Sequence, residues 1–242
     1  MTSSTHLVIG VGEVGTAIRQ NLSEHYKSVE SIDKDQTTVG TFDFIHICFP
    51  YSDTFTLAVM QYQLKYEATN GITIIHSTVP VGTTERLNAV HSPVRGVHPH
   101  LYEGVKLCTK FFGGKNIHKV NRAMEVFFPI CPVHRVTDSN TSEALKLWCT
   151  TQYGWNIILE KAIHNYCVMN NLNFDEVYTL SNITYNEDAI KLNMPHVRRP
   201  VLKHMDGPIG GHCVMPNARI LSEDSSLANM LLFLNEQLTG ND

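Results

Sequence analysis

The sequence predicts an α/β fold, in which a doubly wound parallel sheet is followed by a mainly α-helical second domain. Short apolar runs alternate with helical or turn segments along the N-terminal half, and a glycine-rich turn follows the first run. A long helical pattern then replaces the strands. Strands that alternate with helices form a parallel sheet covered on both faces. We therefore expect a Rossmann-like domain at residues 1–133 and a central helical domain at residues 134–242.

Apolar runs bounded by turn residues predict the strands of the sheet. Further short strands are expected after them, at Val94–Val97, Phe111–Phe112 and Pro132–Val136. Since helices or turns separate the first runs, consecutive strands are expected to run parallel. The four main runs lie at His6–Gly10, Ser28–Ile32, Phe42–Phe49 and Gly71–His76.

A long helix is expected from Asn140 to Asn170, with Asn140 as its N-cap and Glu143 at the third helical position. Its apolar residues lie on more than one side, which is typical of a helix buried on more than one side. It packs either between two layers of its own chain or against a partner subunit. One apolar stripe consists of Leu145, Trp148, Trp155, Leu159, Ala162 and Tyr166, whereas Leu147 and Ile158 lie elsewhere.

The remaining helical domain is expected to contain helices at Phe174–Leu180 and Ser222–Leu238, with a loop at Asn193–Pro200. A formal charge of −4 offers no basic field for nucleic acid. No apolar run approaches the ~20 residues of a membrane-spanning helix, and no signal peptide is evident. The chain is therefore expected in the cytoplasm.

The cysteines and histidines give no sign of a metal site. Six widely spaced cysteines without a CxxC pair are best interpreted as reduced thiols, mostly in the core. His98 and His100 flank a proline and cannot form a helical ligand pair. We expect no bound metal.

The segment Gly10-Val-Gly-Glu-Val-Gly15 predicts a dinucleotide site, because it follows a strand and opens a helix. The first glycine makes the turn, Gly12 admits the pyrophosphate, and Gly15 lets helix pack on strand. Glu13 and Val14 begin the helix whose amide groups face the phosphates. Asp33 at the end of the next strand would accept the ribose hydroxyls and favours NAD over NADP. The alternative is a glycine-rich turn in another kind of α/β protein.

Two further strand ends could line the same site. Ligands bind beyond the carboxyl ends of parallel strands, so Ser77 and Thr78 could face the nicotinamide, and Pro50 with Tyr51 could form a wall. By itself the segment after Ser77 favours a simpler interpretation, a capping box in which Thr83 or Thr84 opens the helix that holds Glu85. The Pro50 corner is by itself an ordinary turn.

Lys146 lies on one face of the long helix with Glu143 and Thr150. Next to a dehydrogenase site this lysine could act as a general base or donate a hydrogen bond to a developing alkoxide. Without other context, a solvated helix lysine paired with Glu143 is the favoured interpretation.

The segment Gly207-Pro-Ile-Gly-Gly-His-Cys213 places a thiol in a glycine-dense turn. Glycines let a ligand come close, and an activated thiol there can act as a nucleophile. His212 could activate it, although neighbours in sequence need not meet in space. Free cysteine is also commonly buried and inert, which is the alternative for Cys213.

Five segments in this order resemble the UDP-glucose/GDP-mannose dehydrogenase family, particularly its branch acting on UDP-N-acetylhexosamines. The resemblance covers essentially the whole chain. The five are the glycine fingerprint with Asp33, Ser77–Thr83, Tyr102-Glu103-Gly104, Ser142-Glu-Ala-Leu-Lys146 and Gly207–Cys213.

The resemblance implies a double oxidation of a sugar C6 alcohol to a carboxylate with two NAD. Cys213 would form a thiohemiacetal with the intermediate aldehyde, and Lys146 would assist proton transfer and stabilise oxyanions. Glu103 and Thr78 match residues that line the reacting centre and orient water. The central helix of the family forms a dimer core, which implies a homodimer through residues 140–170.

The chain departs from the family at several points. Thr150 stands where the family has an asparagine, and Asn217 stands where it has an aspartate four residues after the cysteine. The turn before Cys213 is one residue shorter, and Pro216 precedes Asn217. The family continues into a third domain that binds the nucleotide of the sugar, whereas this sequence stops near its start, so the substrate is expected to be smaller or a partner to complete the site.

Three hypotheses follow from these observations. The leading one is an NAD-dependent dehydrogenase that oxidises a primary alcohol of a sugar-like or smaller substrate. The second is a non-catalytic NAD-binding relative or partner protein, which Thr150 and Asn217 favour. The third is a single-step hydroxyacid-type dehydrogenase that uses Lys146 and leaves Cys213 as a bystander.

Overall fold

The computed structural model describes residues 3–96 and 99–238. Contacts divide the chain into two compact units, Met1–Lys146 (unit 1) and Leu147–Asp242 (unit 2). The division falls inside helix α6 (Ser139–Met169), whose first residues belong to unit 1 and whose remainder belongs to unit 2. The domain boundary near residue 134 stays a prediction.

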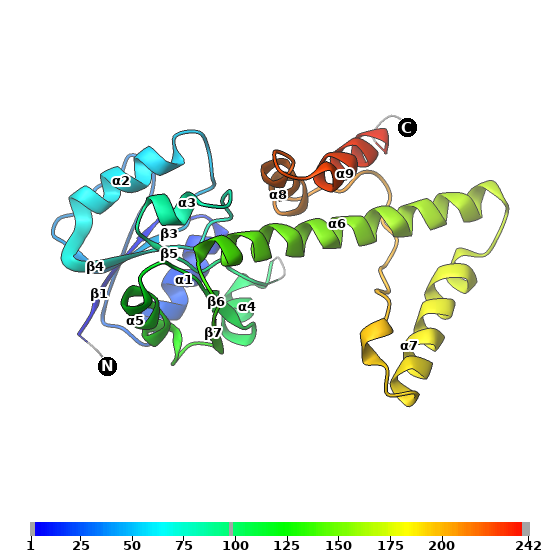
Figure 1. The fold of residues 1–242 in the computed structure, drawn as a ribbon, viewed down its shortest axis with the longest axis horizontal. Coiled ribbons are helices and arrows are strands. Elements are labelled where there is room, and N and C mark those ends of the chain that lie inside the picture. The colour runs from blue at the N-terminus through cyan, green and yellow to red at the C-terminus, as the bar shows by residue number, and fades with distance from the viewer. Residues whose placement is uncertain (1–2, 97–98, 239–242) are drawn as a thin grey trace. The chain divides into compact units, whose positions relative to one another are not determined.

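Unit 1 is built on a five-stranded parallel sheet with the strand order β2-β1-β3-β4-β5 (Figure 1). The chain moves from β1 to β2 on one side and then to β3 on the other, which makes a topological switch point between β1 and β3. The predicted doubly wound parallel sheet is confirmed. Its strands are β1 (Thr5–Ile9), β2 (Ser28–Ile32), β3 (Phe42–Ile47), β4 (Glu67–Ile75) and β5 (Val90–His91).

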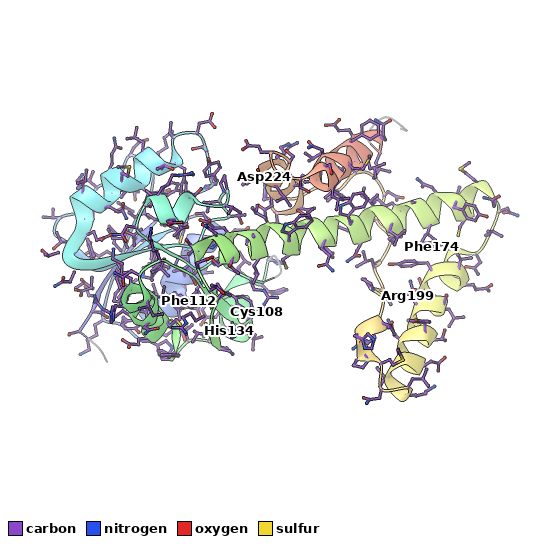
Figure 2. The ribbon with its side chains drawn as sticks, in the orientation of Figure 1. Cys108, Phe112, His134, Phe174, Arg199 and Asp224 are labelled. Carbon is purple, nitrogen blue, oxygen red and sulfur yellow. The ribbon has the colours of Figure 1, made fainter. Side chains whose placement is uncertain are left out.

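The two later strands form a small parallel pair, and one expected strand is wrong. β6 (Lys110–Phe112) and β7 (Val133–Arg135) agree with the predicted strands; they carry Phe112 and His134, both labelled in Figure 2. Residues 94–96 are not a strand, and Val97 lies outside the described residues. The carbonyl of Val94 binds the side chain of Lys146, and that of Ser92, just before this segment, binds Lys110.

Apolar side chains on both faces of the sheet form the core of unit 1, as expected for a parallel sheet. Leu7 and Ile45 point to one face, and Val8 and Phe44 to the other. Described residues 33–41 connect β2 and β3 without a helix. The helices of unit 1 other than α6 are α1 (Glu13–Ser23), α2 (Phe55–Tyr66), α3 (Thr83–Arg86), α4 (Leu101–Leu107) and α5 (Ile117–Phe127).

Unit 2 is helical, as predicted. The expected helix at Phe174–Leu180 is a π-helical segment, η1 (Asp175–Leu180), that continues into α7 (Ser181–Lys191). The loop at Asn193–Pro200 contains one short 3-10 turn, η2 (Pro195–Val197). The helix expected at Ser222–Leu238 is α9 (Ser226–Gln237), which begins later because the side chain of Ser225 accepts a hydrogen bond at its start. A further helix that was not expected, α8 (Val214–Leu221), precedes it.

The long helix is confirmed, but its N-cap is Asp138 rather than Asn140. Oδ1 of Asp138 accepts a hydrogen bond of 2.7 Å from the amide of Thr141. Hydrogen bonding from Thr141 lowers the pKa of Asp138 below its ordinary value. Glu143 therefore does not complete a capping box with Asn140. No helix among residues 3–96 and 99–238 is long and apolar enough to cross a membrane.

Helix α6 carries apolar residues on two faces, as its sequence predicts. Ile158 is 9% exposed in a cluster with Val214 and Leu231 from α8 and α9. Gly154 permits this approach, because a Cβ atom there would lie 2.7 Å from Cγ1 of Val214. Leu159, by contrast, is 59% exposed.

Candidate functional site

The fingerprint glycines form a tight turn between β1 and α1. Gly10 has a φ of 92°, a left-handed conformation that favours glycine. A Cβ atom on Gly15 would lie 1.7 Å from the carbonyl oxygen of Gly10, so helix and strand can pack only around glycine. Gly12 has no atom within 4 Å of such a Cβ position. The turn thus leaves open space beside the N-terminus of α1, where Glu13 and Val14 begin the helix.

Asp33 follows β2, the strand beside β1. Its backbone amide donates to Oε1 of Gln36 at 2.9 Å, and its carbonyl accepts from the amide of Gln36 at 3.0 Å. Both of these bonds use the backbone of Asp33. The neighbouring Asp35 has a φ of 66°, which shapes this turn.

The other predicted cofactor residues follow β3 and β4 at the same edge of the sheet. Pro50 is exposed, and the ring of Tyr51 lies 5.6 Å from that of Phe55. Oγ of Ser77 donates to the carbonyl of Phe49 at 2.6 Å and ties the ends of β3 and β4 together. Thr78, directly after it, is partly exposed. The predicted residues thus lie at the carboxyl edge of the sheet, but the Ser77 hydroxyl is already used in a hydrogen bond that holds two strand ends together.

Glu143 binds the start of α3, a role that the sequence did not reveal. Its carboxylate accepts from the amides of Gly82, at 2.6 Å, and Thr84, at 2.8 Å. The expected capping box led by Thr83 or Thr84 is wrong, since the capping acceptor comes from α6. Burial raises the pKa of Glu143 above its ordinary value. No local pattern could identify this contact, because it joins residues far apart in the sequence.

Lys146 has a partner other than the predicted one. Its Nζ donates to the carbonyl oxygen of Val94 at 2.9 Å, and the side chain is partly buried. The expected pairing with Glu143 is not what holds it, because that carboxylate binds the backbone of α3. Lys146 therefore lies beside residues 92–96, the extended segment after β5.

Glu103 is exposed in α4. This short helix packs along α1 in unit 1, where Asn21 donates to the carbonyl of Tyr102 at 3.2 Å. The neighbouring Tyr102 hydroxyl and Lys106 bind Glu24. These contacts of α4 are made by Tyr102 and Lys106.

The cysteine turn belongs to unit 2. Gly207 and Gly211 have φ values of 74° and 80°, and no atom lies within 4 Å of a Cβ position on either or on Gly210. The turn leads into α8, whose N-cap is Cys213. The sulfur is partly exposed and is not in a disulfide. A thiol at this position lies at the positive end of a helix.

Asn235 on α9 anchors this turn, and the sequence did not single it out. Its Oδ1 accepts from the amide of Ile209 at 2.6 Å. Its Nδ2 donates to the carbonyl of the same residue at 3.4 Å. A buried asparagine with both amide atoms bound to one backbone residue fixes the turn two residues before Gly211.

Thr150 and Asn217, the two departures from the family pattern, are bonded to each other. Nδ2 of Asn217 donates to Oγ1 of Thr150 at 3.1 Å, and that hydroxyl donates to the carbonyl of Leu147 at 3.1 Å. The Asn217 amide nitrogen also donates to the carbonyl of Cys213 at 3.2 Å. The structure thus joins the side chains of Thr150 and Asn217 within unit 2, and Cys213 lies one turn before Asn217 at the start of α8. Lys146 lies one turn before Thr150 on α6.

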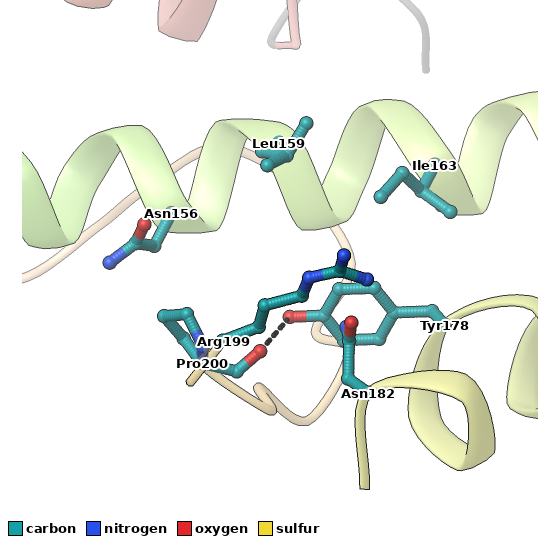
Figure 3. A pocket seen from close by; sticks show the side chains of 7 residues that line it. All are labelled: Asn156, Leu159, Ile163, Tyr178, Asn182, Arg199 and Pro200. Carbon is teal, nitrogen blue, oxygen red and sulfur yellow. Dashed lines mark hydrogen bonds between the residues drawn. The ribbon is translucent and has the colours of Figure 1, made fainter. Parts of the chain in front are cut away.

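A separate cavity of about 300 Å³ lies in unit 2, between α6 and the segment around Arg199 (Figure 3). The hydroxyl of Tyr178 donates to the carbonyl of Pro200 at 3.2 Å across one side. None of the predicted site residues lines this cavity. Its lining consists of Asn156, Leu159, Ile163, Tyr178, Asn182, Arg199 and Pro200.

The comparisons with known proteins point to nucleotide-sugar dehydrogenases. No family model matches the chain. A UDP-N-acetyl-D-mannosamine dehydrogenase of Methanococcus maripaludis is 24% identical over 188 residues, which are 74% of this chain and 41% of that protein. The chain therefore spans about two fifths of the length of this curated relative.

Solved structures share the fold. A UDP-D-ManNAc dehydrogenase from Pyrococcus horikoshii superimposes with a TM-score of 0.80 at 17% identity, over 97% of this chain and 69% of that one. A 3-hydroxyisobutyrate dehydrogenase from Mycobacterium tuberculosis gives 0.73 at 12% identity, over 98% and 94%. The homologues of this chain are UDP-N-acetylmannosamine dehydrogenases, and its structural neighbours include these enzymes and UDP-glucose and GDP-mannose dehydrogenases.

Proposed function

We propose that the chain is an NAD-dependent oxidoreductase that oxidises a primary alcohol of a sugar-like substrate. The observation that carries this proposal is the open glycine turn between β1 and α1, with Asp33 at the end of the adjacent strand. The nucleotide-sugar dehydrogenase relatives support an oxidoreductase of this kind.

The residues at the carboxyl edge of the sheet fit a dinucleotide. Gly12 leaves space for a pyrophosphate, and the first amides of α1 can donate to it. Asp33 would accept hydrogen bonds from the ribose hydroxyls, and its negative charge would repel a 2′-phosphate. Tyr51, Pro50, Ser77 and Thr78 would border the nicotinamide half.

NAD, when bound, accepts the hydride removed from the substrate in each oxidation. We assign Cys213 the covalent step, in which its sulfur bonds to the aldehyde carbon and gives a thiohemiacetal. Oxidation of that adduct gives a thioester, which water cleaves to a carboxylate and the free thiol. Lys146 would take the proton of the alcohol and donate to the oxyanion, while Glu103 and Thr78 would orient water.

A single-step oxidation is the second candidate, and the Thr150–Asn217 bond favours it. Asn217 donates its amide to Thr150, and an amide, unlike the aspartate of the family, cannot take a proton from water. Thioester hydrolysis would then lack a base at this position. In that case the chain would catalyse only the oxidation of an alcohol, as a hydroxyacid-type dehydrogenase does, and Lys146 would be the only residue needed to take the alcohol proton. A non-catalytic NAD-binding protein is the third candidate.

The apolar face of α6 supports a homodimer. Leu159 and Tyr166 are 59% and 61% exposed, although the opposite face of the helix is buried. We propose that a second copy covers this face in the cytoplasm, and that a partner supplies the substrate-binding domain if a nucleotide sugar is bound. Replacement of Leu159 and Tyr166 by glutamate should convert the dimer to a monomer in sedimentation equilibrium; a wild-type monomer would contradict the assembly.

Titration calorimetry tests the cofactor site. The chain should bind NAD more tightly than NADP, and Gly12→Val should abolish binding, because its side chain enters the open turn. Gly210→Val is the matched control, since Gly210 is equally open but lies in unit 2. The absence of NAD binding at millimolar concentration would overturn the enzyme hypotheses.

Product stoichiometry tests the chemistry. With UDP-N-acetyl-D-mannosamine as the first trial substrate, the leading proposal predicts two NADH per substrate and arrest at the aldehyde in Cys213→Ser. Cys149→Ser, at an exposed cysteine of α6, should leave the stoichiometry unchanged. One NADH that is unaffected by Cys213→Ser but lost in Lys146→Ala would support the single-step candidate.

A further inference from the structure

One face of the unit 1 sheet carries three buried histidines that hydrogen-bond in a row. Nδ1 of His6 on β1 lies 3.1 Å from Nε2 of His46 on β3. Nδ1 of His46 lies 3.0 Å from Nε2 of His76, directly after β4. Val8 pairs with His46, and His46 pairs with Ile74. Each histidine therefore lies two residues beyond the position that would pair with the histidine on the preceding strand. The row therefore runs diagonally from the amino edge of the sheet to its carboxyl edge.

Each end of the row has a defined partner. Oγ of Ser4, which is partly exposed, lies 3.0 Å from Nε2 of His6. At the other end, Nδ1 of His76 lies 2.8 Å from the carbonyl oxygen of Ser92 and 3.1 Å from Nζ of Lys110. Nζ of Lys110 also donates to that carbonyl at 2.8 Å, and the lysine is 4% exposed. The row thus links a hydroxyl near solvent to a buried amine.

While Lys110 is neutral, the Ser92 carbonyl determines the tautomer of each imidazole in the row. A carbonyl oxygen only accepts, so while Lys110 is a neutral amine, Nδ1 of His76 carries a proton and donates it to this carbonyl at 2.8 Å. Nε2 of His76 then accepts from Nδ1 of His46, and Nε2 of His46 accepts from Nδ1 of His6. Ser4 donates to Nε2 of His6. Once Lys110 is an ammonium, its Nζ can donate to both the Ser92 carbonyl and Nδ1 of His76, and that nitrogen then carries no proton.

We propose that Ser4, His6, His46, His76 and Lys110 form a proton relay that exchanges the proton of the buried Lys110 with solvent. A proton from solvent enters through the Ser4 hydroxyl and bonds to Nε2 of His6. Each imidazole then passes its Nδ1 proton to the next group, and the last reaches Nζ of Lys110. One proton enters, Lys110 gains one positive charge, and the three imidazoles stay neutral as Nε2–H tautomers.

The surroundings favour neutral imidazoles and a titrating lysine. Burial lowers the pKa of His6 to about 4, lowers the pKa values of His46 and His76 well below their ordinary value, and lowers the pKa of Lys110 to about 7. The three rings bond in a row, and no group in residues 3–96 and 99–238 is arranged to hold a metal ion. The titratable neighbours of the relay are Tyr26, Asp43, Cys48, His91, Cys131 and Lys146.

Lys110 and Lys146 share one short segment of backbone. Lys110 binds the carbonyl of Ser92 and Lys146 binds that of Val94, and the charge of Lys146 opposes that of Lys110. Protonation of Lys110 therefore adds a like charge beside Lys146. This consequence, which rests on the proposed function, makes Lys110 a positioning residue that sets the electrostatic field at Lys146.

Nuclear magnetic resonance of the full chain, labelled with ¹⁵N-histidine and free of dinucleotide, tests the relay directly. Neutral Nδ1–H and Nε2–H tautomers give different ¹⁵N shifts, so a pH titration from 6 to 9 follows all three rings. We expect the three to change tautomer together at one midpoint, without forming imidazolium. Lys110→Met should hold them as Nδ1–H throughout, and Lys115→Met, at an exposed lysine, should behave as wild type.

The outcomes separate the relay from the proposed function. Rings that keep one tautomer at every pH, or that charge independently at different midpoints, would overturn the relay in the wild-type protein without any variant. His46→Phe should uncouple His6 from Lys110, so a His6 that still changes tautomer with Lys110 would also contradict it. If an oxidation is measured, Lys110→Met should shift its pH profile at an unchanged KM, whereas failure to find a substrate leaves the spectroscopic result intact.

Discussion

Replacement of Lys110 by methionine is expected to stabilise unit 1, and to do so more at pH 7 than at pH 9. Methionine has a similar length and no charge. Burial lowers the pKa of the Lys110 ammonium from 10.5 to about 7. At one pKa unit per 1.36 kcal/mol, that displacement corresponds to about 5 kcal/mol of differential interaction. Loss of the hydrogen bond to Ser92 offsets about 1 kcal/mol of the gain.

The direction of the pH dependence follows from proton uptake. Between pH 7 and 10.5 the unfolded chain keeps the Lys110 proton while the folded chain has released it, so stability rises with pH across this window. The wild-type protein should gain about 2 kcal/mol between pH 7 and 9 relative to Lys110→Met. The variant should therefore be more stable than wild type by about 3 kcal/mol at pH 7 and by about 1 kcal/mol at pH 9.

Hydrogen exchange as a function of denaturant is the suitable assay, measured on peptides from β1, β3 and β4. Tryptophan fluorescence would not report unit 1, because Trp148 and Trp155 both lie in unit 2. Lys115→Met serves as the control, since its side chain is 77% exposed. A Lys110→Met variant that is less stable than wild type at pH 7, or whose effect is the same at both pH values, would refute the reasoning.

Three further predictions concern the helices around the candidate site. Gly154→Ala places a Cβ atom 2.7 Å from Val214 and should cost unit 2 about 1–3 kcal/mol in a denaturation followed by tryptophan fluorescence; no loss would show that α8 moves freely. Glu143→Gln should speed hydrogen exchange in α3 several-fold, because the charge-assisted bonds to its amides are lost, and unchanged exchange would contradict this capping role. Asn217→Asp should raise the steady-state turnover rate if the missing carboxylate limits thioester hydrolysis, which follows the second hydride transfer, whereas an unchanged turnover rate would assign the slow step elsewhere.

The elements that the sequence predicted best are those set by local patterns. The strands of unit 1 and the helix at Asn140–Asn170 follow from apolar periodicity and turn residues, which act within a few positions along the chain. The glycine turn at Gly10 is similar, since its φ of 92° and the packing of Gly15 follow from the fingerprint itself. The strand expected at Val94–Val97 is absent from residues 94–96, where the carbonyl of Val94 binds Lys146 from α6.

The contacts of the candidate residues were decided only by the tertiary structure. Lys146 looked like a partner of Glu143, but the fold gives that carboxylate to the amides of α3 and gives Lys146 the carbonyl of Val94. Thr150 and Asn217 are two separate departures from the family pattern in the sequence, but in the structure a hydrogen bond joins their side chains.

The three buried histidines show the same difference between what local patterns determine and what the assembled fold determines. The sequence placed His6, His46 and His76 in or beside three strands and so determined that each would be held in a sheet. Only the strand order β1-β3-β4 and its register bring their rings within hydrogen-bonding distance. Local patterns determine which element a residue joins, because they act along the chain; contacts between elements depend on how the sheet is assembled, which no local pattern encodes.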